Sequence, residues 1–104
     1  MSYAVDFTPG AEDDLLRLYE YLLDRAETLE ELEMAEVALQ VIRQAALSHL
    51  STTPFSYRKV GRRSTLRELI IPFGTMGYVL RFDIRSPESV LVIGARHQRE
   101  EDFH

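Results

Sequence analysis

Residues 76–84, with the sequence MGYVLRFDI, decide the fold, because large apolar side chains recur at every second position. A period of two is typical of a β-strand that is buried on one face. We expect one face to pack beneath helices, and it comprises Tyr78, Leu80, Phe82 and Ile84. The opposite face carries Val79, Arg81 and Asp83, so it is only partly apolar and is expected to stay open.

Two further strands flank this one along the chain. Residues 66–71 and residues 89–95 are rich in apolar and β-branched side chains. The segments between the strands, residues 72–75 and 85–88, each contain proline and have the composition of turns. Residues 66–95 therefore predict a three-stranded antiparallel meander.

The chain begins with another short strand, followed by a helix. Residues 3–7 alternate as a half-buried strand does. Thr8 supplies a capping hydroxyl, and Pro9 is tolerated at the first position of a helix. An apolar stripe at helical spacing then continues to about Asp24.

A second helix follows almost at once. Thr28 and Glu31 form a capping box, in which each side chain accepts a hydrogen bond from a free backbone amide, and Pro54 ends the helix. Only residues 25–27 connect the two helices, which predicts an antiparallel hairpin. We therefore expect an α+β fold of one domain, residues 1–104, with a strand, a helical hairpin and the meander.

Composition narrows the setting in which the protein works. The chain has no cysteine, which excludes disulfides, thiolate zinc sites and cysteine nucleophiles and favours a reducing cytosol. No stretch approaches the ~20 apolar residues that would span a bilayer. We expect a cytoplasmic protein that does not bind membranes.

The net charge of −5 is unevenly distributed along the chain. Residues 1–56 hold 11 acids and 3 bases, whereas residues 57–104 hold 6 acids and 9 bases. Every base except Lys59 is an arginine, which binds carboxylates or phosphates through two parallel hydrogen bonds. The basic half either complements the acidic helices of the same molecule or binds an acidic partner. Residues 55–65 are expected to form a basic loop around Gly61.

Several kinds of site are absent from the sequence. It has no glycine-rich phosphate-binding motif, and its three histidines lack metal-ligand spacing, so we expect no cofactor and no metal. What remains is a set of arginine, histidine and tyrosine side chains that we expect to meet on the open sheet face: Arg67, Tyr78, Arg81, Arg96, His97 and Arg99. Such a set suits metal-free RNA cleavage, in which arginines stabilise charge and a histidine or tyrosine moves protons. It also suits the binding of an acidic protein, or simple surface salt bridges.

Four parts of the chain match a known family in order and spacing. They are YAVDFTP with AEDDL (residues 3–9 and 11–15), LREL (66–69), GYVLRF (77–82) and VIGARHQRE (92–100). Through these segments the chain resembles the ParE branch of the RelE/ParE superfamily, the toxins of type II toxin–antitoxin systems. The resemblance covers essentially the whole length and implies a strand, a helical hairpin and a curved antiparallel sheet.

The resemblance implies one of two activities. RelE-like members are ribosome-dependent mRNA endonucleases with an arginine directly after the Gly-Tyr of the middle strand and a tyrosine near the C-terminus. Here Val79 follows Gly-Tyr, and the aromatic residue of the tail is Phe103. Arg96 does fall where a RelE-like phosphate-binding arginine would, and His104 could replace the tyrosine. If the protein is a nuclease, its catalytic residues would be Arg81, Arg96, His97 and His104.

ParE-like members instead bind and inhibit DNA gyrase, and do no chemistry themselves. The acidic pI of about 5.1 favours this activity, because a protein that enters the RNA-lined decoding site is usually strongly basic. We therefore expect a gyrase inhibitor of the kind found in bacterial plasmid-stabilisation modules, without direct nucleic-acid binding, and not an enzyme. A toxin fold with another target, or with none, is a further alternative.

The resemblance also implies a cognate antitoxin, whose acidic and disordered C-terminal segment folds on the toxin. On the open face, we expect this segment to bind Arg67, Val79, Arg81 and Arg96. The residues expected to contact gyrase are Arg58, Lys59, Arg62, Arg63, His97, Arg99 and Phe103.

Overall fold

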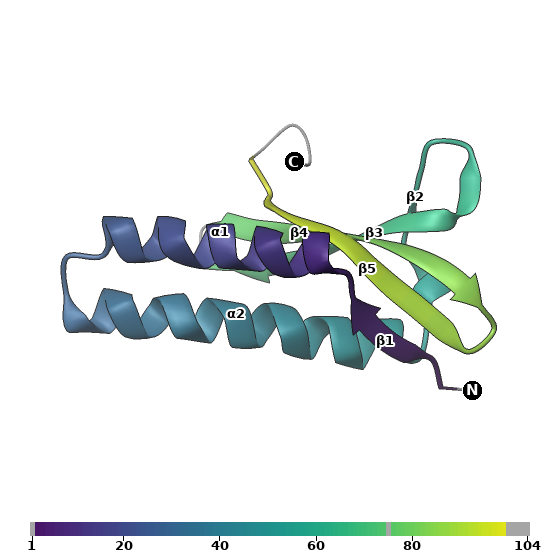
Figure 1. Ribbon diagram of the computed structural model, residues 1–104, viewed down its shortest axis with the longest axis horizontal. Helices are drawn as coiled ribbons and strands as arrows, with labels where there is room; N and C mark the ends of the chain where they lie inside the picture. Colours follow the sequence, from purple (N-terminus) through teal and green to yellow (C-terminus); the bar gives the residue numbers. More distant parts are fainter. Residues whose placement is uncertain (1, 75, 100–104) are drawn as a thin grey trace.

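The computed structural model describes residues 2–74 and 76–99. A helical hairpin covers one face of a five-stranded sheet (Figure 1). In chain order the elements are β1 (Ala4–Phe7), α1 (Pro9–Arg25), α2 (Leu29–Leu50), a 3-10 turn (Pro54–Ser56), β2 (Arg58–Val60), β3 (Arg63–Phe73), β4 (Met76–Ser86) and β5 (Ser89–His97). The α+β class, the helical hairpin and the meander are confirmed.

Both helices begin where the sequence predicts. The Ala11 amide donates to the Thr8 hydroxyl at 3.0 Å, and the Glu31 amide donates to the Thr28 hydroxyl at 3.1 Å. Each bond satisfies an amide that has no partner within its own helix. Within the described residues, neither helix has the length and apolar character needed to cross a membrane.

The strands lie in the order β1-β5-β4-β3-β2. Strands β3, β4 and β5 form the predicted antiparallel meander. Strand β1 pairs in parallel with β5, from Ala4 opposite Ser89 to Phe7 opposite Val92. The sequence predicted β1 without a partner, because a parallel pairing depends on how the intervening helices pack.

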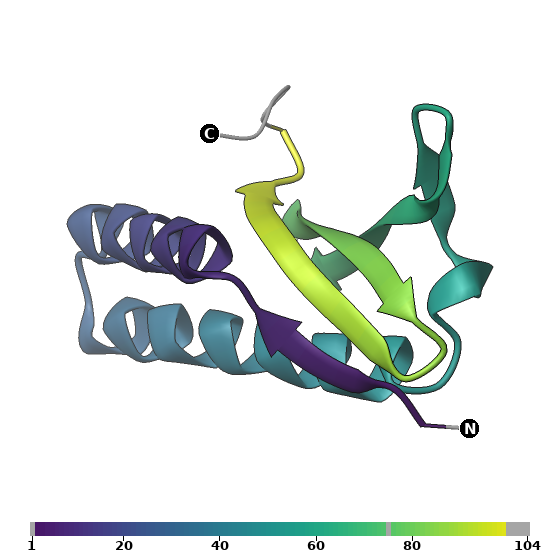
Figure 2. The ribbon, with the colours of Figure 1, turned by 45° about the vertical axis from the view of Figure 1, so that its right-hand side comes forward.

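The expectation of a loop over residues 55–65 is wrong. Arg58–Val60 form β2, which pairs with the start of β3 as a tight hairpin. Gly61 closes this hairpin with a φ of 64°, a left-handed conformation that glycine adopts without a steric penalty. Figures 1 and 2 both show the β2–β3 hairpin standing out from the body of the molecule, away from the loop between the helices.

The core lies between the helices and the face of the sheet that the alternation of β4 predicts. Phe82 and Leu80 are fully buried there, and Tyr78 and Ile84 are nearly so. Alanines on α2 let the two helices approach closely. The helix residues of this core are Ala11, Leu15, Leu18, Ala38, Ile42, Ala46 and Leu50.

A β-bulge in β5 changes which of its side chains share a face. Arg81 pairs with Gly94, but the next residue, Phe82, pairs with Val92, so Ile93 has no partner in β4. An extra residue of this kind reverses the alternation beyond it. Val92 and Ala95 therefore both face the helices, although three positions separate them.

Helix α1 covers the edge of β5 beyond the point where β1 ends. The Ala95 amide donates to Asp14 Oδ2 at 2.9 Å, and Arg17 Nη2 donates to the Ala95 carbonyl at 3.4 Å. Asp14 is only 6% exposed. Two side chains of α1 thus replace the partner strand that β5 lacks there, which leaves this edge closed to other chains.

Replacing Asp14 by alanine is expected to destabilise the fold, because the buried Ala95 amide loses its acceptor. The free energy of unfolding should fall by about 2 kcal/mol, measured by urea denaturation. Asp13→Ala, at an exposed neighbouring position, should change it by less than about 0.5 kcal/mol. Equal effects of the two substitutions would contradict the role of Asp14.

Candidate functional site

The sheet face opposite the helices carries an arginine–carboxylate lattice. We use this name for Glu68 and Asp83 together with the four arginines that bind them: Arg58, Arg63, Arg81 and Arg85. Arg58 and Arg81 contact the two oxygens of Glu68 at 2.7 and 3.0 Å. Arg63 and Arg85 contact Asp83 Oδ2 at 3.0 and 3.4 Å. The lattice ties β2, β3 and β4 together.

Glu68 is the most enclosed charge of this lattice, with a side chain only 6% exposed. Burial alone raises the pKa of a carboxyl group, but hydrogen bonds and Coulombic attraction from Arg58 and Arg81 outweigh it and hold the pKa of Glu68 below its usual value of 4.5. Glu68 is therefore ionised at neutral pH. It is a weak proton acceptor there.

Arg81 and Arg96 lie on this face together, as predicted. They flank Val79, which is opposite Arg96 in β5 and two residues before Arg81. Val79 itself is only 2% exposed, so the expectation that it offers contact surface is wrong. Its cross-strand neighbours, Ile70 and Arg96, have longer side chains. Ile70 is a large apolar residue of this face that is exposed, at 43%.

Tyr78 and His97 do not join these arginines, which corrects the predicted cluster. They are cross-strand partners on the helix-covered face, and their rings meet edge to face with centroids 5.7 Å apart. The bulge at Ile93 is the reason, because it places Arg96 and His97 on the opposite faces from those that uninterrupted alternation along β5 would assign. Burial also raises the pKa of Tyr78.

Arg67 is also on the helix side of the sheet, since it pairs with Phe82. Its guanidinium donates to three backbone carbonyls, those of Ser64, Phe55 and Tyr57, at 2.8 to 2.9 Å. These bonds fasten the start of the β2–β3 hairpin to the 3-10 turn. The expectation that Arg67 shares a surface with Arg81 is therefore wrong.

The residues predicted to contact the target are divided between two places. Four of them belong to the β2–β3 hairpin: Arg58, Lys59, Arg62 and Arg63. Arg99 is exposed just beyond β5, where its amide donates to His97 Nδ1 at 3.2 Å. Phe103 and His104 lie outside the described residues.

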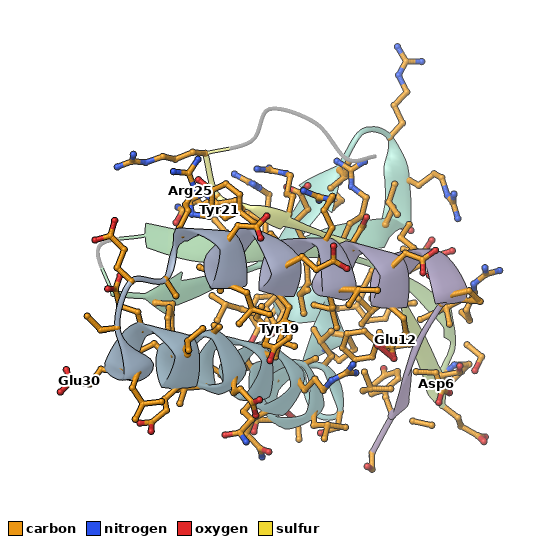
Figure 3. The ribbon with its side chains drawn as sticks, turned by 60° about the vertical axis from the view of Figure 1, so that its left-hand side comes forward. Asp6, Glu12, Tyr19, Tyr21, Arg25 and Glu30 are labelled. Carbon is orange, nitrogen blue, oxygen red and sulfur yellow. The ribbon has the colours of Figure 1, made fainter. Side chains whose placement is uncertain are left out.

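A depression of about 300 Å³ near the end of α1 was not predicted. Arg25 lies there with its guanidinium 4.4 Å from the centre of the Tyr21 ring, and the two side chains are seen together in Figure 3. The other lining residues are Leu22, Phe73, Gly74, Tyr78 and His97. The sequence gives only a weak signal for this depression. Tyr21 and Arg25 have the spacing of an ordinary exposed pair on a helix, and the depression forms only when the sheet packs beside them.

No group of three or more histidine, aspartate or glutamate side chains is placed to hold a metal ion in residues 2–74 and 76–99. The arrangement on the open face is one of fixed positive charge beside buried carboxylates. Its charge is complementary to that of an acidic segment or an anion.

Comparison with known proteins places the chain in a class, the toxins of type II toxin–antitoxin systems. Residues 5–102 match the model of the family described as the ParE toxin of the type II toxin–antitoxin system parDE. The chain belongs to this ParE toxin family.

One relative agrees with this assignment, and one solved structure has the same fold. Toxin RelE3 of Caulobacter vibrioides is 31% identical over 97 residues, which cover 93% of this chain and 96% of that protein. A chain of the chromosomal ParDE toxin–antitoxin system from P. aeruginosa has a similar fold, with a TM-score of 0.69 at 14% identity, over 92% of this chain and 96% of that one. A toxin of this family has an antitoxin partner.

Replacing Glu68 by glutamine should reveal the lattice in the pH dependence of stability. The pKa of Glu68 is lower in the folded than in the unfolded chain, so the unfolded chain takes up the proton first as the pH falls. At pH 7 the free energy of unfolding of the wild type should be about 1–3 kcal/mol higher than that of Glu68→Gln. This difference should vanish below pH 4.5, as the pH falls through the lowered pKa. Denaturation at a series of pH values measures it, and a constant difference would contradict the lattice.

Proposed function

We propose that this toxin inhibits DNA gyrase by binding it, and that a cognate antitoxin neutralises the toxin. The observation that carries the proposal is the division of the predicted arginine, histidine and tyrosine set between the two faces of the sheet. Arg81 and Arg96 lie on the open face, whereas Tyr78 and His97 lie on the face that the helices cover. A nuclease needs charge stabilisation and proton transfer at the same phosphate.

Among residues 2–74 and 76–99, the acids of the open face do not take over the proton transfer that was expected of Tyr78 and His97. A general base works best with a pKa near the working pH, and the pKa of Glu68 is lowered by two arginines. Asp83 is engaged by Arg63 and Arg85. The arginines of this face are therefore suited to holding a partner rather than to turning over a substrate.

Ribosome-dependent mRNA cleavage is the second candidate. The name of Toxin RelE3, a relative 31% identical to this chain, favours it. So does the presence of Arg81 and Arg96 on the same open face, where a phosphate could be bound. The two activities differ in what they leave behind, since only one of them breaks transcripts.

A gyrase supercoiling assay run beside an RNA-cleavage assay on ribosomes distinguishes the two. We expect the purified toxin to stop supercoiling and to leave mRNA intact. If the wild type cleaves mRNA and does not affect supercoiling, and if Arg96→Ala leaves mRNA intact, the toxin is a nuclease and the proposal is wrong. A toxin that is inactive in both assays would indicate another target or none.

The antitoxin is proposed to place its acidic C-terminal segment along the open face. Arg81 and Arg96 supply positive charge there, and Ile70 supplies the apolar contact that was expected of Val79. A disordered segment that folds on contact can cover such an extended surface. Arg67 is now proposed to have a structural role and not to bind the antitoxin, because its guanidinium is bound to backbone carbonyls.

Arg96→Ala should weaken binding of the antitoxin segment by at least about 10-fold, because a charged contact is lost at the centre of the proposed surface. Titration calorimetry with the synthetic segment measures this. Arg43→Ala is the matched control, since Arg43 pairs with Glu12 on the helices. A complex in which Arg81 and Arg96 stay exposed to solvent would overturn the assignment.

A further inference from the structure

The tip of the β2–β3 hairpin displays two bases that the fold does not use. Lys59 and Arg62 are exposed, and neither forms an ion pair within residues 2–74 and 76–99. Residues 58–67 as a whole contain five bases and no acid. A charged side chain that contributes to stability normally has a partner, so these two bases are available for an external one.

The other bases of the hairpin hold it in place. Arg58 reaches back to Glu68, Arg63 reaches Asp83, and Arg67 binds backbone carbonyls at the foot of the hairpin. Each of these bonds fixes the strands and leaves the tip free to make contacts. A preorganised surface loses less conformational entropy on binding than a flexible loop does.

The hairpin is also far from one group of acids, those in the first turn of α2. The first turn of α2, with Glu30 and Glu31, lies at the loop between the helices, as the label of Glu30 shows in Figure 3. The hairpin rises from the other end of the 44 Å long axis (Figures 1 and 2). The net charge of −5, from which no nucleic-acid binding was expected, does not describe this end of the protein.

We infer that the β2–β3 hairpin binds the phosphate backbone of double-stranded DNA through Lys59 and Arg62. Between these two bases the tip carries only Val60 and Gly61, so it lacks the aromatic anchors on which protein interfaces depend. Surfaces that bind nucleic acid are polar and positively charged. The choice of DNA rests on the proposed function, because gyrase acts while bound to a DNA duplex. The inferred target is therefore gyrase together with its bound DNA.

Binding of the complete toxin to a fluorescein-labelled DNA duplex, followed by anisotropy at several salt concentrations, tests the contact without gyrase. Each phosphate contact contributes about −0.9 to the slope of log K against log salt concentration. The double variant Lys59→Ala/Arg62→Ala should therefore flatten the slope by about 2. Arg25→Ala/Arg43→Ala, which removes the same charge from the helices, should leave the slope unchanged.

Two results of this titration would overturn the inference. One is an equal slope for the wild type and the hairpin variant. The other is tighter binding to an RNA stem of the same sequence than to the DNA duplex, which would direct the hairpin to RNA instead.

A supercoiling assay with gyrase and plasmid DNA then separates this inference from the proposed function. We expect the hairpin variant to need at least about 10-fold more protein than the wild type or the helix variant for the same inhibition. If the wild type does not inhibit gyrase but binds DNA through the hairpin, the proposed function fails and the DNA contact stands. If the hairpin variant loses DNA binding yet inhibits gyrase fully, the inferred target is wrong. If it binds DNA normally but loses inhibition, the hairpin contacts an acidic protein surface.

Discussion

The hydrogen bond from the Ala95 amide to the buried Asp14 carboxylate is the contact on which the arrangement of the molecule depends. Strand β1 pairs with β5 only as far as Val92, and then the chain turns into α1. From there the helix takes over from the strand, with Asp14 and Arg17 binding the amide and the carbonyl of Ala95. A buried backbone group without a partner is costly, so this contact fixes where α1 lies against the sheet. Helix α1 packs against the face of the sheet that the alternation of β4 makes apolar.

The bulge at Ile93 determines the chemistry of the two faces. Without it, Arg96 would face the helices, and His97 would join Arg81 on the open side. With it, the open face gathers arginines and salt-bridged acids, and the aromatic and histidine side chains lie on the helix side. One inserted residue thus separates Arg96 from His97. This separation is the basis of the proposal that the toxin acts by binding.

The arginine–carboxylate lattice gives the positive half of the chain two different uses. Four of its eight arginines pair with Glu68 and Asp83. These acids belong to the sheet, so the four arginines do not complement the acidic helices, as the simpler interpretation of the charge separation expected. Their bonds join β2 and β3 to β4 and fix the position of the β2–β3 hairpin relative to the rest of the sheet. The salt bridges that engage the neighbouring arginines therefore also hold Lys59 and Arg62 in position at the tip.

Both helices, every strand except β2 and the buried face of the sheet are predictable from local sequence signals. Capping residues such as Thr8 and Thr28, and the period of two through Tyr78 and Phe82, are local signals that act within a few residues. Only the tertiary structure decided the parallel pairing of β1, the hairpin of β2 and the division of Arg96 from His97. These features depend on contacts between residues far apart in the chain and on one unpaired residue in β5, and neither leaves a periodic trace in the sequence.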